Sequence, residues 1–171
     1  MPAREIATKC KGFTIRAAEE YEVPLILRFI VELADYEGVA HEVEATEDLL
    51  RENLFGERPS AEVIFGCLDG EPVGFALFFH NFSTFQGKPG IYIEDLYVRP
   101  EVRGRGYGTA MLAYLASLTL ERKGGRFEWG VFTWNTPARE YYVSIGAKPQ
   151  ERYLLNRVEG QALADLAGRF A

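Results

Sequence analysis

The sequence predicts a mixed α/β domain, and three observations lead to that prediction. Runs rich in β-branched and aromatic residues alternate along the 171 residues with segments whose apolar side chains recur at helical spacing. Two of the β-rich runs flank the turn-forming pair Asp69-Gly70, which predicts an antiparallel hairpin. Later in the chain a strand, a helix and a second strand follow one another, which predicts a βαβ crossover in the same sheet.

The first third of the chain is expected to contain one strand and two helices. Residues 12–18 have the composition of a short strand. Residues 21–37 carry their apolar side chains on one helical face, and Pro24 fits the first turn, where a missing N–H costs little. Residues 45–55 predict a second helix that starts at Thr46 as N-cap and has acidic residues in its first turn.

The rest of the chain is expected to alternate strands with helices. The sequence contains no internal repeat and no linker, so residues 1–171 are predicted to form one domain. After the hairpin at 61–82, strands are predicted at 90–98, 126–134 and 151–158, and helices at 109–124, 136–147 and 160–170.

Composition narrows the classes of partner. The chain has 25 acidic against 19 basic side chains, a net charge of −6, which disfavours nucleic acid and suits a small cationic substrate. It has neither an apolar signal-peptide core nor an apolar stretch long enough to span a bilayer, so we expect a cytoplasmic protein with no membrane partner. Cys10 and Cys67 match no metal-ligand spacing, so no metal is expected.

A glycine cluster lies between a predicted strand and a predicted helix. Gly104, Gly106 and Gly108 would allow the backbone to approach an anion, and the N–H groups of a helix N-terminus bind phosphate. Arg103 and Arg105 could add charge-assisted hydrogen bonds to phosphate oxygens. This arrangement favours a phosphate-binding loop; the alternative is a flexible, solvated turn.

The spacing of this cluster excludes two familiar nucleotide motifs. In a G-x-G-x-x-G dinucleotide motif the third glycine would stand where Thr109 stands. A Walker A loop needs a lysine after its last glycine, and none follows here.

Two adjacent carboxylates, Glu94 and Asp95, precede the loop in the strand predicted at 90–98. Neighbouring residues of a regular strand point to opposite faces, so the two can share one site only if the strand contains a bulge. The alternative is that one forms a salt bridge and the other lies at a rim.

These residues carry a resemblance to a known family. Arg103-x-x-Gly106-x-Gly108 resembles the R/Q-x-x-G-x-G/A loop of the GNAT N-acetyltransferase superfamily, which binds the pyrophosphate of acetyl-CoA. The segments "VELADYE", "TEDLL", "FGERP", "IEDLYV", "WNTPAREYYVSIGA" and the late "YLL" are similar to the diamine and thialysine acetyltransferase branch. The resemblance implies the GNAT fold, a central, mixed, mostly antiparallel sheet flanked by helices, with a bulge in the strand that holds Glu94.

The resemblance also implies how acetyl-CoA is held. The glycine loop would bind the pyrophosphate, and N–H groups of the bulged strand would bind the thioester oxygen and the pantetheine amides. The implied coenzyme-binding residues are Leu96, Tyr97, Val98, Arg103, Gly104, Arg105, Gly106, Tyr107, Gly108, Thr109, Asn135, Pro137, Ala138 and Tyr142.

Two residues are implied to act in catalysis. Glu94 would attract the ammonium of the acceptor and accept its proton, directly or through water. Tyr142 would protonate the leaving thiolate. It is seven residues after Asn135, which places both on nearly the same face of a helix and favours Tyr142 over Tyr141. The alternative for Tyr142 is a packed core aromatic.

The acceptor site is implied to be anionic and to bind a small primary amine. Where diamine members of the branch have an acidic residue, this chain has Ser83, which favours an acceptor that bears its own carboxylate. The implied acceptor-binding residues are Tyr36, Glu37, Ser83, Thr84, Glu94 and Asp95.

The sequence therefore predicts transfer of an acetyl group from acetyl-CoA to the primary amine of a lysine-like amino acid, such as thialysine, or of a polyamine. Two alternatives remain open at this point: a protein or peptide acetyltransferase of the same fold, and an acyl-CoA-binding sensor without turnover. The resemblance also implies a homodimer in which C-terminal segments pack across the interface.

Overall fold

The computed structural model describes residues 4–170. The chain divides into two compact units, which meet in sequence at Gly130 and Val131. The first unit contains the sheet and three α-helices, and the second contains two α-helices.

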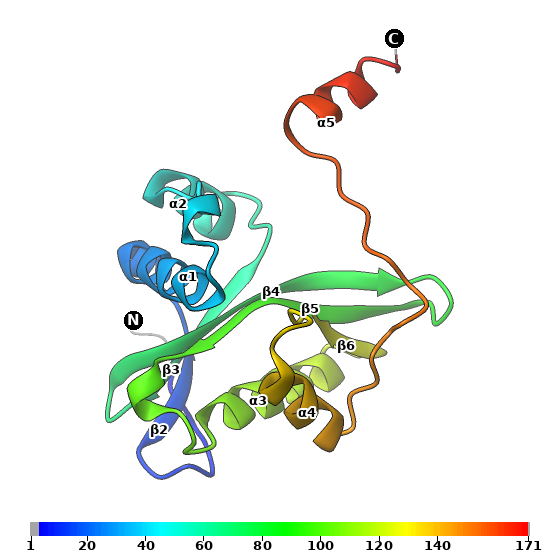
Figure 1. Ribbon diagram of the computed structural model, residues 1–171. Coiled ribbons are helices and arrows are strands. Elements are labelled where there is room, and N and C mark those ends of the chain that lie inside the picture. Colours follow the sequence, from blue (N-terminus) through cyan, green and yellow to red (C-terminus); the bar gives the residue numbers. More distant parts are fainter. Residues whose placement is uncertain (1–3, 171) are drawn as a thin grey trace. The chain divides into compact units, whose positions relative to one another are not determined.

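The first unit is built on one six-stranded sheet with strand order β1-β2-β3-β4-β5-β6 (Figure 1). Neighbouring strands are antiparallel except for β5 and β6, which are parallel and joined by a helix. The predicted mixed, mostly antiparallel sheet with a βαβ crossover is confirmed. The strands are β1 (Ile6–Ala7), β2 (Phe13–Ala17), β3 (Glu62–Leu68), β4 (Glu71–Ser83), β5 (Lys88–Val98) and β6 (Arg126–Trp129).

Helices cover both faces of this sheet. Helices α1 (Val23–Glu37) and α2 (Glu47–Phe55) lie on one face, and α3 (Tyr107–Glu121) lies on the other (Figure 1). Three short 3₁₀ segments join these elements: η1 (Glu20–Glu22), η2 (Ala40–Glu42) and η3 (Pro100–Val102).

Local sequence signals account for the ends of these elements. Pro24 lies in the first turn of α1, and Gly38 ends that helix with φ 78°, a left-handed conformation that favours glycine. The Thr46 hydroxyl accepts a hydrogen bond from the Leu49 N–H at 3.3 Å, which caps α2 as predicted. Both turn residues between β3 and β4 have positive φ, as a tight hairpin requires.

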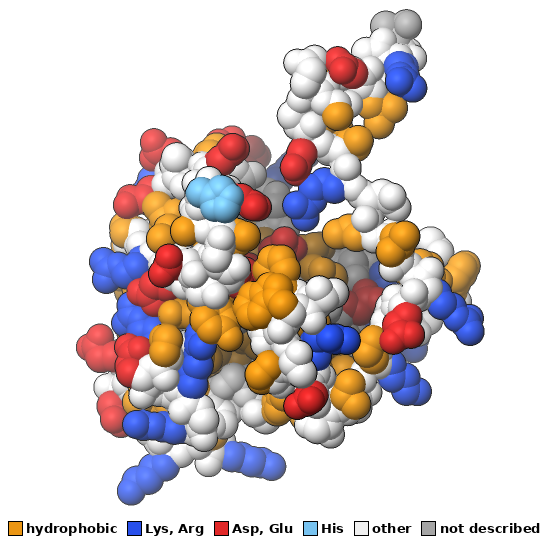
Figure 2. All heavy atoms as spheres, viewed as in Figure 1, with side chains coloured by type: hydrophobic (Ala, Val, Ile, Leu, Met, Phe, Trp, Pro, Cys, Tyr) orange, Lys and Arg blue, Asp and Glu red, His pale blue; other side chains and the backbone are white. Residues whose placement is uncertain are grey.

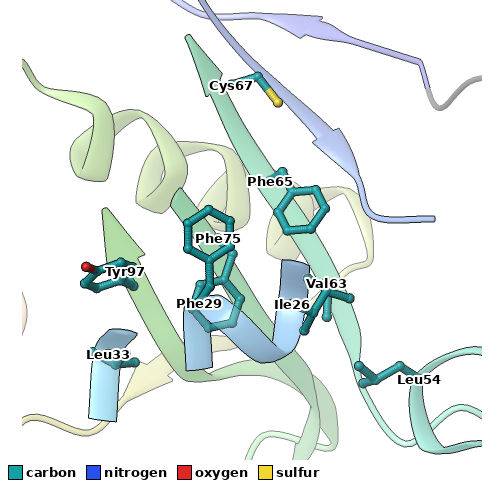
Figure 3. Close-up of a cluster of buried hydrophobic side chains, with 9 residues drawn as sticks. All are labelled: Ile26, Phe29, Leu33, Leu54, Val63, Phe65, Cys67, Phe75 and Tyr97. Carbon is teal, nitrogen blue, oxygen red and sulfur yellow. The ribbon is translucent and has the colours of Figure 1, made fainter. Parts of the chain in front are cut away.

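The core between α1 and the sheet is rich in aromatic rings. Phe29 of α1 stacks on Phe75 of β4 with ring centroids 5.5 Å apart and contacts Phe65 of β3 at 5.9 Å (Figure 3). All three side chains are fully buried. Burial of rings of this size stabilises the unit, and truncating one to alanine would cost about 3–5 kcal/mol. This packing fixes α1 over the middle of β3, β4 and β5.

The structure corrects three details of the predicted elements. Strand β1 was not predicted, because two residues are too few to produce an alternating pattern. Strand β6 ends at Trp129 rather than at residue 134. Residues 151–158 alternate as a strand would, but the sheet of the described chain holds no strand there. A strand needs a partner for its backbone groups, and alternation alone does not supply one.

The second unit contains α4 (Thr136–Ser144) and α5 (Gly160–Ala167), somewhat shorter than the two predicted helices. The Asn135 side chain caps α4 by accepting a hydrogen bond from the Ala138 N–H at 3.3 Å. Between the helices, Leu154 and Leu155 are 89% and 85% exposed.

Candidate active site

A β-bulge in β5 brings the two adjacent carboxylates into one region. Asp95 pairs with Leu77 of β4 and Ile93 pairs with the next residue, Phe78, so Glu94 has no partner in the register. The extra residue reverses the alternation of β5 at that point. Asp95 therefore lies on the same face of the sheet as Tyr92, and the bulge expected from the family resemblance is confirmed.

The α1 face of the sheet holds this region. Phe75, Leu77 and Phe79 alternate along β4 and point to one face. Phe75 stacks on Phe29 of α1, and Phe79 contacts the Tyr92 ring at 5.2 Å. The carboxylate of Asp95, opposite Leu77, thus lies on the α1 side, near the C-terminal end of that helix.

The carboxylates of this region interact electrostatically. Burial, followed by the negative charges of Glu94 and Glu37, raises the pKa of Asp95 from 3.8 to about 6. Burial also raises the pKa of Glu37. Glu94 is exposed, whereas Asp95 and Glu37 are partly buried. The negative charges of Glu94 and Glu37 disfavour the charge of Asp95, and a cation would stabilise such a site.

The edge of β5 next to the bulge is open. Strand β6 pairs with β5 only from Gly90 to Ile93, and no other strand of residues 4–170 continues along that edge. The Arg99 N–H donates to the Val73 carbonyl of β4 at 2.9 Å. Because alternate residues of a strand face the same neighbour, the N–H groups of Leu96 and Val98 point away from β4, to the open edge.

The glycine loop connects this edge to α3. Gly104 and Gly106 have φ 77° and 84°, in the left-handed region where other residues are strained. Gly106 is the N-cap of α3, and the first bond within the helix runs from the Ala110 N–H to its carbonyl at 2.9 Å. Gly104, Gly106 and Arg105 are exposed, so the positive end of the helix dipole opens to the surface.

The Arg103 side chain connects the glycine loop to β5 and to α1. Its Nε donates to the Val98 carbonyl on the open edge of β5 at 2.7 Å. Its guanidinium carbon lies 4.4 Å from the ring centre of Tyr36 and 5.3 Å from that of Tyr97. The side chain thus joins the loop to the end of α1 through cation–π contacts.

Tyr107 supports the loop from inside the unit. Its ring is only 7% exposed and stacks on Phe13 of β2 with centroids 4.3 Å apart. A coenzyme at the loop could therefore meet Tyr107 only through its backbone. Gly108 has open space around it, and Thr109 is exposed in the first turn of α3.

Ser83 and Thr84 lie at the far end of the β4–β5 hairpin. Ser83 is 7% exposed, and its hydroxyl accepts a hydrogen bond from the Gln86 N–H at 3.3 Å. Ser83 pairs with Lys88, five residues along β4 from the bulge. At about 3.3 Å per residue this is roughly 17 Å, so the two residues are not brought next to the carboxylates.

The second unit holds Asn135, Pro137, Ala138 and Tyr142. Pro137 lies in the first turn of α4, and Asn135 and Ala138 form the cap described above. Tyr142 is partly exposed and its ring lies 5.7 Å from that of Tyr141. The described residues of α4 include no fully buried side chain, so Tyr142 is not a buried core aromatic.

A polar cluster that was not predicted from the sequence lies on the α1 face of the sheet. Asn81 of β4 donates from Nδ2 to Glu128 Oε2 of β6 at 2.7 Å, and Arg126 Nε lies 2.9 Å from the same oxygen. A signal was available, since Arg126 and Glu128 are two residues apart and share a strand face. Nothing in the sequence, however, indicates that this face is the one that holds Asp95.

The described residues offer neither a membrane-spanning helix nor a cluster of metal ligands. None of the helices within residues 4–170 is both long and apolar enough to cross a membrane. In the same part of the chain, no group of three or more His, Cys, Asp or Glu side chains could hold a metal ion.

The fold and the loop define an acetyltransferase. Residues 27–147 match the acetyltransferase (GNAT) family, and the chain belongs to that family. The match runs from α1 through the bulged strand and the glycine loop to the end of α4.

Named relatives agree with the branch that the sequence resembles. Thialysine N-epsilon-acetyltransferase of Sus scrofa is 37% identical over 170 residues, which cover 91% of this chain and 97% of the relative. L-ornithine N5-acetyltransferase of Arabidopsis thaliana is 29% identical, over 87% of this chain and 85% of its own. Among solved structures, an integron cassette protein from the mobile metagenome of V. cholerae matches with a TM-score of 0.76 and 26% identity, over 91% of this chain and 98% of that one.

Proposed function

We propose that the protein transfers an acetyl group from acetyl-CoA to the primary amine of a small cationic molecule. The observation that carries the proposal is the bulge in β5. It places Glu94 and Asp95 beside an open strand edge, and that edge leads directly into the glycine loop.

The donor would bind along the open edge and the loop. The α3 N-terminus and the backbone of Gly104 to Gly108 would hold the pyrophosphate, with Arg105 free to turn its side chain toward it. The N–H groups of Leu96 and Val98 would donate to the pantetheine and to the thioester oxygen, on which negative charge develops during attack. Asn135, Pro137 and Ala138 would hold the pantetheine arm, as the family resemblance implies.

The acceptor would bind at the acidic region. An alkylammonium with a pKa near 10.4 must lose a proton before it attacks the thioester. Exposed Glu94 would take that proton, directly or through water, while Asp95 and Glu37 would hold the cation. Tyr36, the neighbour of Glu37 in α1, would contact the acceptor, as the family resemblance implies. The amine nitrogen then bonds to the acetyl carbon and the carbon–sulfur bond breaks. Tyr142 would donate its hydroxyl proton to the leaving thiolate, and the second proton released by the nitrogen, passed through solvent, would restore that hydroxyl.

The proposed acceptors are a lysine-like amino acid, such as thialysine, or a polyamine. Support comes from two relatives, which are named for acetylation of thialysine and of L-ornithine. The contribution of Ser83 and Thr84 to that choice remains a prediction. Because they lie roughly 17 Å from the bulge along the strand, they could reach only a long acceptor within one chain.

We further propose that residues 1–171 act as one N-acetyltransferase domain, in a cytoplasmic homodimer. The family match supports the first part, because it crosses the junction between the two compact units. The exposed apolar side chains of residues 153–170 support the second, because a monomer would leave them in water.

The test is release of free thiol from acetyl-CoA across a panel of polyamines, lysine analogues, amino acids and peptides. Turnover with one or more of these amines is expected. Turnover only with peptides would favour the protein acetyltransferase. Binding of acetyl-CoA by calorimetry with no thiol release from any acceptor would favour the sensor.

A further inference from the structure

The polar cluster of Asn81, Arg126 and Glu128 crosses three strands on the face that holds Asp95. Asn81 pairs with Gly90 of β5, and Gly90 pairs with Arg126 of β6. A side chain at Gly90 would block the crossing, since a Cβ there would lie 2.4 Å from Asn81 Oδ1. Glycine at this position therefore allows charged groups of β6 to reach over β5.

The cluster and the acidic region lie on the same face. Tyr92 of β5 pairs with Glu128 of β6, and the Tyr92 ring contacts Phe79 of β4. Phe79 points to the same face of β4 as Leu77, which pairs with Asp95. Phe79 and Tyr92 thus form an aromatic floor between Asp95 and Glu128. Both rings are partly exposed, so this floor is accessible to a ligand.

The charged groups of the cluster keep capacity for a ligand. The Arg126 and Glu128 side chains are each 35% exposed. The contacts within the cluster use Oε2 of Glu128 and Nε of Arg126. Arg126 Nη2 donates a hydrogen bond to the Phe82 carbonyl at 3.2 Å. Within residues 4–170 this leaves Glu128 Oε1 and Arg126 Nη1 without a protein partner.

The spacing suits an amino acid with a terminal amine. From Asp95 to Glu128 the sheet advances two residues along β4 and one strand across, about 8 Å between backbone positions. An extended lysine spans about 6 Å from its terminal nitrogen to its Cα, over five bonds. Glu128 Oε2 is turned toward Asn81 and Arg126, which lie beyond Glu128 as seen from Asp95. An extended molecule with its terminal amine at Asp95 would therefore reach the cluster with its other end.

We propose that this cluster recognises the α-amino and α-carboxylate groups of an amino-acid acceptor whose terminal amine lies at Asp95. Glu128 binds the α-ammonium, and Arg126 binds the α-carboxylate. Asn81 holds Glu128 in place and is a positioning residue. The inference rests on the proposed function and narrows its acceptor from a lysine-like amino acid or a polyamine to an ω-amino amino acid.

Three amines separate the two contacts. L-Lysine has both α-groups, pentane-1,5-diamine lacks the carboxylate, and 6-aminohexanoate lacks the α-amine. Arg126→Gln should raise KM by about tenfold, the scale of one charged contact, for lysine and 6-aminohexanoate but not for the diamine. Glu128→Gln should raise KM for lysine and the diamine but not for 6-aminohexanoate. In both variants kcat should change little.

Glu62→Gln is the matched control. It breaks an Arg–Glu pair with Arg122, the residue that follows α3, and Arg122 lies over the Phe78 ring on the opposite face of the sheet. Its KM for all three amines should equal that of the wild type. Thermal unfolding of each variant shows whether the fold is kept.

The outcomes are distinct. Equal changes in KM for all three amines, or none, would mean that the cluster only joins the strands, and would overturn the inference. Wild-type enzyme that acetylates polyamines but prefers the diamine to lysine would overturn it too and leave the proposed function standing. No thiol release with any amine of the wider panel would instead remove the proposed function.

Discussion

Asp95 is held in an environment that disfavours its charge. Burial and the carboxylates of Glu94 and Glu37 raise its pKa to about 6, so at neutral pH the folded protein bears the cost of an ionised carboxylate in an acidic region. A cationic substrate relieves that cost. The same charge that weakens the fold would therefore strengthen binding of the acceptor.

Asp95→Asn should stabilise the protein and impair its activity. Since the folded pKa is raised, the penalty is absent below about pH 4, grows as pH rises toward 6, and is complete above it. A shift of this size, discounted for partial exposure, gives a gain of about 1–2 kcal/mol at pH 8. Thermal unfolding at pH 8 and pH 4 measures it, and an equal gain at both pH values would contradict the argument. KM for the amine should rise.

Tyr142→Phe tests the proposed acid. The change keeps the ring and removes the hydroxyl, so kcat should fall by about 10²-fold while the affinity for acetyl-CoA stays nearly constant. Tyr141→Phe is the control, since that ring is the adjacent one and is also partly exposed. Full activity in the Tyr142 variant would rule out the assignment.

At the scale of elements, the strand-to-helix junction combines charge with conformation. Basic side chains gather at the lower end of the molecule in Figure 2, below β2 in Figure 1. Net charge over the whole chain is negative, so a phosphate must be attracted locally. The α3 N-terminus and the positive φ of two glycines provide that local attraction.

Gly106→Val should weaken acetyl-CoA binding by about tenfold or more, on the order of 1.4 kcal/mol, because a side chain strains φ 84° and crowds the loop. Gly87→Val is the control. It imposes a similar strain at φ 62° on the turn between β4 and β5, with open space around it. Calorimetry that finds the same loss of affinity in both variants would show a general effect of strain.

Helices and turns could be predicted from the sequence better than contacts between residues that lie far apart in the chain. The capped helices and the hairpin follow from signals a few residues long, such as Thr46 and Asp69-Gly70. The bulge at Glu94 was expected only through the family resemblance, because its cause is the register with β4. The cluster of Asn81 and Glu128 joins residues 47 positions apart, and its register could not be read from composition or periodicity.

At the scale of the whole molecule, the C-terminal segment requires an explanation. Leu154 and Leu155 are almost fully exposed, and Phe170 is 98% exposed. Apolar side chains left in water at this density are typical of an interaction surface. The family resemblance implies that a second copy of the chain covers them.

A double change of Leu154 and Leu155 to Asp should therefore convert a dimer to a monomer. Light scattering at micromolar concentration should give about twice 19.3 kDa for the wild type and that mass for the variant. A double change of Arg152 and Arg157 to Asp is the control. It alters the charge of the same segment but removes no apolar contact, so this variant should keep the mass of the wild type. A wild-type mass near 19 kDa would exclude a stable dimer.

The short pairing of β5 with β6 has a consequence for dynamics. Beyond Ile93 the sheet lacks one row of hydrogen bonds, and the proposed coenzyme would supply it as a substitute strand. Amide hydrogen exchange should then differ between alternate residues of β5. The Leu96 and Val98 amides should exchange quickly in the free protein and slowly with coenzyme A bound, whereas the Tyr97 amide, which faces β4, should exchange slowly in both. In that sense the ligand would complete the secondary structure of the enzyme during each catalytic cycle.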